Sequence, residues 1–233
     1  MGDHLRSMIV LLCFVGVPKN VVAQFSADYG EEIPFSYRLH SDIRDAYLDK
    51  RSSDEHRLLQ YLMVNYEKAA RPVVNASTAM TVKIGFVLTQ IASVDERNQV
   101  LTVNVWLEQE WTDEVLVWDP AKFGGIEMII VPSTKIWLPD IVLYNNADDY
   151  NKNLMPVNVV LQHTGNVFWS PPTKMRSTCK IDTTYFPFDD QKCLLKLGSW
   201  IYDGYQLDVV KRKDNVDMTD YMESGEWVII NTT

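Results

Sequence analysis

The chain has 233 residues and a formal net charge of −9 at pH 7. This length is enough for one domain with a sizeable hydrophobic core. The acidic balance makes nucleic acid a poor candidate partner and suits cations or cationic ligands better. A solvated acidic surface without any ligand would give the same charge, so charge alone does not decide between these two interpretations.

The first residues have the pattern of a secretory signal peptide, which we expect over residues 1–23. Arg6 supplies a positive start, residues 8–17 form an apolar run, and Val21-Val22-Ala23 fits a small-residue cleavage site. A membrane anchor or a buried helix is the alternative. The apolar run is shorter than the roughly 20 residues that a membrane-spanning helix needs, so the signal peptide is favoured.

Secretion bears on the cysteines and on two asparagines. Cleavage after residue 23 would remove Cys13 and leave Cys179 and Cys193, for which a disulfide is the expected state in an oxidising compartment. The triplets that begin at Asn75 and Asn231 predict N-glycosylation sites. Each triplet is weak evidence alone, because such triplets are common by chance.

Residues 24–50 show no clear period and are interpreted as an N-terminal extension, with the main domain over 51–233. The run Ser52-Ser53-Asp54-Glu55 offers a capping box and acidic side chains at the positive end of a helix. Apolar residues then recur at helical spacing at Leu58, Leu59, Leu62 and Tyr66. This helix should end before Arg71-Pro72, because proline disfavours helical geometry in the residue before it.

From Val82 onward the apolar period changes to two, which predicts a half-buried strand followed, after the polar turn 93–98, by a second strand from Leu101 to Leu107. Further strands are expected over 127–131, 166–170 and 192–200, separated by turn signals rich in proline and glycine. One N-terminal helix followed by short alternating strands predicts a mainly β fold, an antiparallel immunoglobulin-like β-sandwich.

Several aromatic residues break this alternation. Trp111 shares the core parity of its strand and should be buried, whereas the aromatics that lie on polar faces or beside a polar loop are Trp106, Tyr144, Phe168 and Trp200. Such residues can line a box that attracts a cation, at about 0.5–2 kcal/mol per contact. Filling a subunit interface explains them equally well, because parity is easily lost at a bulge.

Other chemistry is sparse in the sequence. It contains none of the common metal, nucleophile or phosphate-binding motifs, and its histidines are scattered, so we expect no enzyme activity, no cofactor and no metal. Asp189 and Asp190 are adjacent carboxylates. Adjacent residues on an extended chain point to opposite faces, so capping or surface roles are expected for this pair rather than acid–base catalysis.

The segment from Cys179 to Cys193, with Phe186-Pro187-Phe188-Asp189 inside it, resembles the signature loop of the Cys-loop pentameric ligand-gated ion channels. Residues 137–148, 197–204 and 222–227 are also similar to that family, and to nicotinic acetylcholine receptor subunits more than to glycine or GABA receptors. The similarity runs from about residue 52 to residue 228 of this chain.

The resemblance implies a role for each out-of-phase aromatic. Tyr144 and Trp200 match the aromatics of the principal face of the agonist site. Trp106, with Glu108 beside it, matches the complementary face, and Phe168 and Ser170 occupy further positions there. In this family the ammonium of acetylcholine or a similar agonist lies between two subunits of a pentamer. The resemblance further implies that the disulfide loop, with Phe186, Phe188, Asp189 and a cis Pro187, couples binding to the pore.

The sequence also departs from the family. The family's next element after the strand near Glu226 is a hairpin, which is followed by a last strand and four membrane helices, and none of these is present in the chain. The expected sandwich therefore has its last hairpin missing, and contact with the membrane is expected only through a region that this chain lacks. Asp149 replaces a glycine of the family, and Lys192 removes a sequon.

Three functional hypotheses follow. The first is the extracellular agonist-binding domain of a nicotinic-type acetylcholine-gated cation channel subunit, which passes through the secretory pathway to the postsynaptic face of the plasma membrane. The second is a secreted, soluble acetylcholine-binding or receptor-modifying isoform without channel activity. The third, a secreted sandwich enzyme or lectin, lacks a supporting cluster of residues in the sequence.

Overall fold

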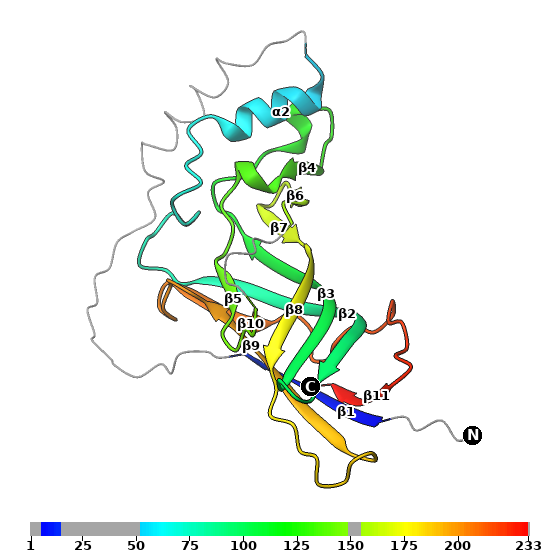
Figure 1. Ribbon diagram of the computed structural model, residues 1–233. Coiled ribbons are helices and arrows are strands. Elements are labelled where there is room, and N and C mark those ends of the chain that lie inside the picture. Colours follow the sequence, from blue (N-terminus) through cyan, green and yellow to red (C-terminus); the bar gives the residue numbers. More distant parts are fainter. Residues whose placement is uncertain (1–5, 15–51, 149–154, 233) are drawn as a thin grey trace.

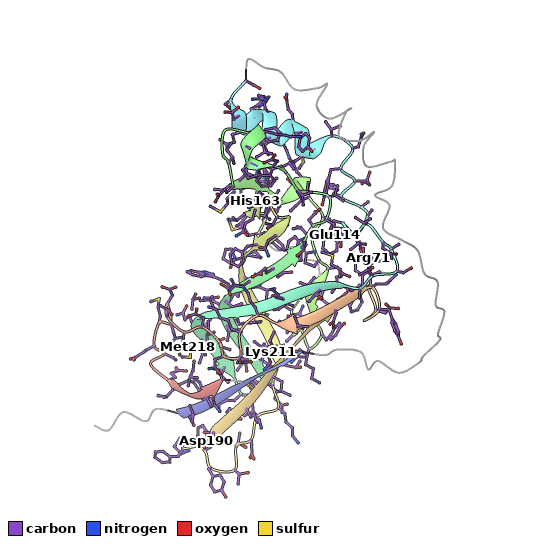
Figure 2. All side chains as sticks on the ribbon, turned by 180° about the vertical axis from the view of Figure 1, so that it is seen from behind. Arg71, Glu114, His163, Asp190, Lys211 and Met218 are labelled. Atoms are coloured by element: carbon purple, nitrogen blue, oxygen red, sulfur yellow. A yellow bond between two sulfur atoms is a disulfide. The ribbon has the colours of Figure 1, made fainter. Side chains whose placement is uncertain are left out.

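The computed structural model describes the backbone of residues 6–14 and both backbone and side chains of residues 52–148 and 155–232. The predicted extension over 24–50 lies outside these residues, as does most of the predicted signal peptide. Helix α2 and strands β4, β6 and β7 lie toward one end of the molecule, and the loop between β8 and β9 forms the opposite end (Figure 1). Side chains cover both ends, with His163 near the first and Asp190 near the second (Figure 2).

Helix α2 spans Asp54–Met63 and begins as the capping box predicts. The Ser53 hydroxyl accepts a hydrogen bond from the His56 amide at 3.3 Å. Leu58 and Leu62 are buried on the inner side of the helix. The helix ends earlier than predicted, because Asn65 adopts a left-handed conformation with φ of 58°, a common way of ending a helix. Tyr66 therefore lies beyond the helix, where its side chain serves a different contact.

The larger sheet has seven strands. Its order is β10-β2-β3-β7-β6-β4, and β8 pairs with β3 as well. The strands are β2 (Met80–Asp95), β3 (Val100–Thr112), β4 (Met128–Pro132), β6 (Asn158–Gln162), β7 (Asn166–Trp169), β8 (Pro172–Thr178) and β10 (Leu207–Lys211). The pairing of β10 with β2 is parallel, so the sheet is mixed rather than purely antiparallel. Short 3₁₀ turns at Pro120–Lys122 and Ser133–Lys135 flank β4.

The smaller sheet has the order β11-β1-β9-β5. Its strands are β1 (Arg6–Phe14), β5 (Ile141–Leu143), β9 (Asp190–Ser199) and β11 (Trp227–Thr232). β1 runs parallel to both β9 and β11, whereas β5 is antiparallel to β9. The strand β1 falls within the predicted signal peptide. Cleavage of that peptide concerns the processing of the chain and stays a prediction.

One hydrophobic core joins the two sheets and the helix. Apolar side chains of β3, β9 and α2 belong to this one core: Leu101, Val103, Val105, Leu107, Leu195, Leu197, Leu58 and Leu62. Trp111, predicted to be buried, is 2% exposed and lies edge-on to Trp137 with ring centroids 5.9 Å apart. The mainly β sandwich with one helix among the described residues is thus confirmed, with mixed rather than strictly antiparallel sheets.

Candidate functional site

Tyr144 and Trp200 form a first group of predicted site residues. Tyr144 follows β5 and Trp200 follows β9, and these two strands are hydrogen-bonded neighbours. Both rings are accessible, at 40% for Tyr144 and 67% for Trp200. The Tyr144 hydroxyl donates a hydrogen bond to the carbonyl of Ser199, the residue before Trp200. The structure therefore brings these two aromatics to the same corner of the smaller sheet, and we call this pair the first half-site.

Asp140 organises the turn that carries Trp200. Its carboxylate accepts hydrogen bonds from the Ser199 hydroxyl at 2.6 Å and from the Ile201 amide at 2.7 Å. Its carbonyl accepts a third from the Trp200 amide at 3.2 Å. These bonds hold the backbone on both sides of the indole, which leaves the ring itself free to face solvent. Reasoning from the sequence did not single out Asp140 as a residue that positions Trp200.

The absence of a side chain at Gly198 allows Tyr144 to lie against β9. A β-carbon at Gly198 would lie 2.8 Å from Tyr144 Oη and 2.9 Å from its Cε2. The ring consequently covers Gly198, which is buried, on the face of β9 that also carries the exposed Lys196. The neighbours Cys193, Leu195 and Leu197 point to the core instead. The first half-site therefore lies on the outer face of the smaller sheet.

The other four predicted residues lie on the larger sheet. Trp106 and Glu108 belong to β3, Phe168 belongs to β7, and Ser170 follows β7. Phe168 is paired with Glu110, so it shares one face with the even-numbered residues of β3. Trp106 is 41% exposed, and the other three are partly buried. The odd-numbered neighbours Val105 and Leu107 are in the core. This second half-site is therefore on the outer face of the larger sheet.

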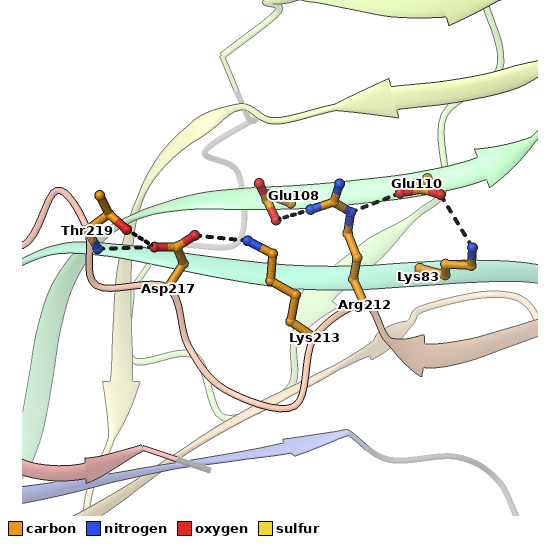
Figure 3. Close-up of polar contacts among 7 residues, drawn as sticks. All are labelled: Lys83, Glu108, Glu110, Arg212, Lys213, Asp217 and Thr219. Atoms are coloured by element: carbon orange, nitrogen blue, oxygen red, sulfur yellow. Dashed lines mark hydrogen bonds and ion pairs between the residues drawn. The ribbon is translucent and has the colours of Figure 1, made fainter.

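An arginine outside the predicted set contacts two residues of the second half-site, Glu108 and Phe168. Arg212 donates to Glu108 through Nη1 at 2.7 Å and to Glu110 through Nε at 2.8 Å (Figure 3). Its guanidinium carbon lies 5.0 Å from the centroid of the Phe168 ring. Lys83 adds a second cation, 3.3 Å from Glu110. The carboxylate of Glu108, which sequence reasoning placed beside the ligand, is thus paired within the chain.

These contacts shift the ionisation of the group. Hydrogen bonding from Arg212 holds the pKa of Glu110 below its usual value, despite partial burial that acts in the opposite direction. The hydrogen bond to Glu110 likewise raises the pKa of Arg212. Both charges are therefore maintained across the whole physiological pH range, and the cluster of two carboxylates and two cations carries no net formal charge.

The two half-sites cannot combine within one chain. The first lies on the outer face of the smaller sheet and the second on the outer face of the larger sheet, with the shared core between them. A side chain that points away from a core cannot meet one that points away from the other side of the same core. A closed aromatic box that uses both half-sites therefore requires two molecules, each of which contributes one face.

The disulfide loop is present as the sequence predicts. Cys179 and Cys193 are bonded, and the bond between Phe186 and Pro187 is cis. Phe186 and Phe188 project into solvent at 55% and 66% exposure. Asp189 differs from its expected surface or capping role, because it is 2% exposed and its carboxylate accepts a hydrogen bond from the Gln191 side chain. Adjacent Asp190 is exposed, so the two carboxylates do point to opposite sides.

Other features of the described residues do not suggest a second kind of site. A polar hollow of about 310 Å³ is lined by Ser93, Thr102, Asp148, Lys174 and Arg176, none of which was predicted to bind ligand. Within residues 52–148 and 155–232 no three histidine, cysteine or acidic side chains are grouped as metal ligands would be. The helices of the described part of the chain are too short or too polar to cross a membrane.

Comparison with known proteins settles the family. A family model described as "Neurotransmitter-gated ion-channel ligand binding domain" matches residues 55–233. This chain belongs to that family. The ligand-binding domain is 45% identical over 186 residues to neuronal acetylcholine receptor subunit beta-3 of Rattus norvegicus, an alignment that covers 80% of the chain and 40% of the relative. The relatives are receptor subunits, which agrees with the prediction that the chain is not an enzyme.

Other neuronal acetylcholine receptor subunits match this chain at similar identity and over a similar length. Identity is 50% over 179 residues with the alpha-2 subunit of Mus musculus, covering 77% of the chain and 35% of the relative. It is 46% over 186 residues with the alpha-4 subunit of Homo sapiens, covering 80% and 30%. The chain thus spans between 30% and 40% of the length of these relatives.

Proposed function

We propose that this chain is the extracellular agonist-binding domain of an acetylcholine-gated cation channel subunit. In this proposal it binds acetylcholine or a similar cationic agonist at the interface with another subunit of a pentamer. The observation that carries the proposal is the position of the six predicted residues. They form two accessible aromatic half-sites on opposite outer faces of one sandwich, which is the arrangement that a ring of subunits with shared sites requires.

Each half-site would contribute differently to the ammonium. Trp200 and Tyr144 offer accessible ring faces on a turn that is held by Asp140. Trp106 is the most exposed ring of the second half-site. Cation–π contacts of this kind contribute about 0.5–1 kcal/mol when exposed and about 2 kcal/mol when desolvated by the partner. Burial between two subunits would therefore strengthen every contact relative to the isolated chain.

The disulfide loop would transmit the effect of binding. Its tip exposes Tyr185, Phe186 and Phe188, which together form an apolar surface at the end of the molecule opposite to α2 (Figure 1). Exposed apolar patches of this kind usually mark contact surfaces. We assign the loop to the membrane-proximal end of an extracellular domain, where it would contact the pore region of a full-length subunit, and the postsynaptic plasma membrane is the proposed location.

Radioligand binding tests the proposal. The chain is co-expressed with a neuronal acetylcholine receptor alpha subunit, and saturation binding of radiolabelled acetylcholine is compared between the wild type and the variants Trp106→Ala and Trp200→Ala. Loss of one ring should weaken binding by about 5- to 30-fold at any interface that uses that half-site. Tyr205→Ala is the matched control, since Tyr205 is 58% exposed but lies outside both half-sites. Unchanged affinity in both tryptophan variants would contradict the proposal.

A further inference from the structure

The chain segment between β10 and β11 is fixed along the edge of β2. Four backbone hydrogen bonds hold it there: Arg212 N to Ile84 O at 2.8 Å, Asp217 N to Phe86 O at 2.8 Å, Leu88 N to Asp217 O at 2.9 Å, and Met222 N to Thr89 O at 2.8 Å. We call residues 212–222 the edge segment. Its backbone continues the parallel pairing of β10 with β2, so its first residue is held as firmly as a strand residue.

Side chains give the edge segment further internal support. Lys213 pairs with Asp217 at 2.9 Å, and Asp217 also accepts hydrogen bonds from the amide and the hydroxyl of Thr219 (Figure 3). These contacts lie beside the second half-site but do not include its residues. Lys213 pairs with Asp217, but its charge also acts on Glu108. The control cation is therefore Lys122, an exposed residue of the 3₁₀ turn before β4.

Arg212 directs its guanidinium toward the surface that a ligand cation would use. It meets both carboxylates of β3 at ion-pair distance and lies over the face of Phe168. The Glu108 and Glu110 side chains are 13% and 19% exposed, so water screens these pairs only partly. An aromatic ring flanked by carboxylates is the chemistry that recognises an ammonium. In this chain the guanidinium of Arg212 already binds both carboxylates and the ring face.

The backbone of β2 is adapted to this contact. Gly85 lies opposite Glu108 in the β2–β3 ladder. A β-carbon at Gly85 would lie 2.6 Å from Glu108 Oε2 and 3.3 Å from Glu108 Cβ. The missing side chain therefore leaves the space in which the Glu108 carboxylate turns toward Arg212. Gly85 and the edge segment, which are distant in sequence, thus both help to form the ion pair between Glu108 and Arg212.

We infer that Arg212 is an internal cation that competes with a ligand's ammonium for the second half-site and so sets its affinity for cations. The inference rests on the proposed function. With Arg212 present, the two carboxylates are balanced by Arg212 and Lys83. Without it, one negative charge is left uncompensated and the face of Phe168 is uncovered, so cations should concentrate at this surface and anions should be repelled.

Collisional quenching of Trp106, in uncleaved chain that retains β1, measures the charge of the second half-site without any agonist. The chain has seven tryptophans, and five of them are at most 6% exposed. In a Trp200→Phe background the quencher-accessible indole is therefore Trp106. It lies two residues along the same strand face from Glu108, a separation of about 7 Å. Caesium and iodide then report the local concentration of cations and anions next to the site.

The expected result is a change of opposite sign for the two quenchers. At low ionic strength Arg212→Gln should raise the caesium quenching constant by about threefold and lower the iodide constant by a similar factor. Arg212→Lys should restore values close to those of the parent, because it keeps the charge. Lys122→Gln removes a charge of the same sign from the end of the molecule that carries α2 and β4, and it should change both constants much less. Equal constants in Arg212→Gln and the parent would overturn the inference.

Agonist affinity supplies the second measurement. In the co-expressed receptor, Arg212→Gln should tighten acetylcholine binding by about three- to tenfold, whereas Lys122→Gln should not. Unchanged affinity in Arg212→Gln, in a receptor whose binding Trp106→Ala does weaken, would refute competition at this site. If Trp106→Ala has no effect, the proposed function fails instead, and the quenching constants alone then decide whether Arg212 excludes cations from this surface.

Discussion

At the scale of single residues, Asp113 is a buried carboxylate whose ionisation should affect the stability of the fold. Its carboxylate is fully buried and accepts hydrogen bonds from the Tyr66 hydroxyl at 2.7 Å and from the amides of Val115 and Leu116 at 3.0 Å each. Burial raises the pKa of Asp113 to about 6, although these hydrogen bonds act in the opposite direction. Burial and the Asp113 charge also raise the pKa of Tyr66. The pair joins the chain after α2 to the end of β3.

The raised pKa of Asp113 predicts an unusual dependence of stability on pH. The folded state binds the proton more tightly than the unfolded state, so the contribution of Asp113 is fully present below the unfolded pKa of 3.8 and is lost as pH rises through 6. Relative to Asp113→Asn, the wild type should therefore gain about 1 kcal/mol in free energy of unfolding between pH 7 and pH 5. Urea denaturation of both proteins, each in the uncleaved form that retains β1, at pH 7, 6 and 5 checks this.

The comparison with Asp113→Asn is needed because other carboxylates respond oppositely. Hydrogen bonding from Lys213 lowers the pKa of Asp217, and Arg212 lowers that of Glu110, so both contributions decrease as the pH falls. Those losses occur equally in the two proteins and cancel in the difference. The wild type and Asp113→Asn differ in free energy of unfolding. If this difference stays constant from pH 7 to pH 5, or decreases toward pH 5, the pKa of Asp113 is not raised.

Single-residue exposure was largely predictable from strand parity. Alternation placed Trp106 outward and Trp111 inward on the same strand, and their exposed fractions are 41% and 2%. The contact of Arg212 with Glu108 was not predictable in this way. It joins positions 104 residues apart in the sequence, and its formation depends on the parallel pairing of β10 with β2, which periodicity does not reveal.

At the scale of elements, the packing of Tyr144, which follows β5, against β9 depends on Gly198. Replacement by alanine would place a methyl group within 3.0 Å of the hydroxyl oxygen and two ring carbons of Tyr144. Because the ring is 40% exposed, it can swing outward rather than strain the core. Gly198→Ala should therefore weaken acetylcholine binding in the co-expressed receptor by about three- to tenfold and reduce stability only slightly.

Gly225→Ala is the matched control for this prediction, because a β-carbon at Gly225 would have no neighbour within 4 Å. Saturation binding gives the affinity of each variant, and thermal denaturation gives its stability. Full agonist affinity in Gly198→Ala would contradict this prediction and would remove Tyr144 from the proposed site.

The boundaries of helices and strands differ from the prediction where tertiary contacts override the local sequence pattern. Helix α2 begins at its predicted capping residues, but it ends before Asn65, which is left-handed. Tyr66 continues the apolar spacing of the helix, but its side chain contacts Asp113 instead of extending the helix. Pro171 and Pro172 indicate a turn, yet Pro172 begins β8, where its missing amide lies opposite Trp106 on β3. These elements are defined by partners distant in sequence, so a local pattern cannot specify them.

At the scale of the whole molecule, the sequence predicts the layers better than the order of the strands. Alternation indicates which residues face the core, and that core does join both sheets. The alternation of apolar and polar residues contains no information on which strand lies beside which. The parallel placement of β1 between β9 and β11 could therefore not be predicted. The sequence pattern of residues 1–23 instead predicts a signal peptide. Under that prediction, β1 (Arg6–Phe14) belongs to the uncleaved chain only.

Processing should consequently change the behaviour of the isolated chain. If the signal peptide is removed after Ala23, the secreted protein begins at Gln24, and β9 and β11 lose the partner to which both are hydrogen-bonded. Two unpaired strand edges favour association with other molecules. We therefore expect N-terminal sequencing of secreted material to begin at Gln24, and size-exclusion chromatography to show low recovery and large aggregates when the chain is expressed alone.

Blocking cleavage provides the control for this prediction. Ala23→Arg replaces the small residue that the cleavage site requires and should retain β1, so material recovered from that variant should aggregate less than processed wild type. Co-expression with a complementary receptor subunit should also improve recovery, because a partner would cover exposed surface. A processed chain that begins at Gln24 and elutes as a stable monomer would show that the edges of β9 and β11 are protected without β1.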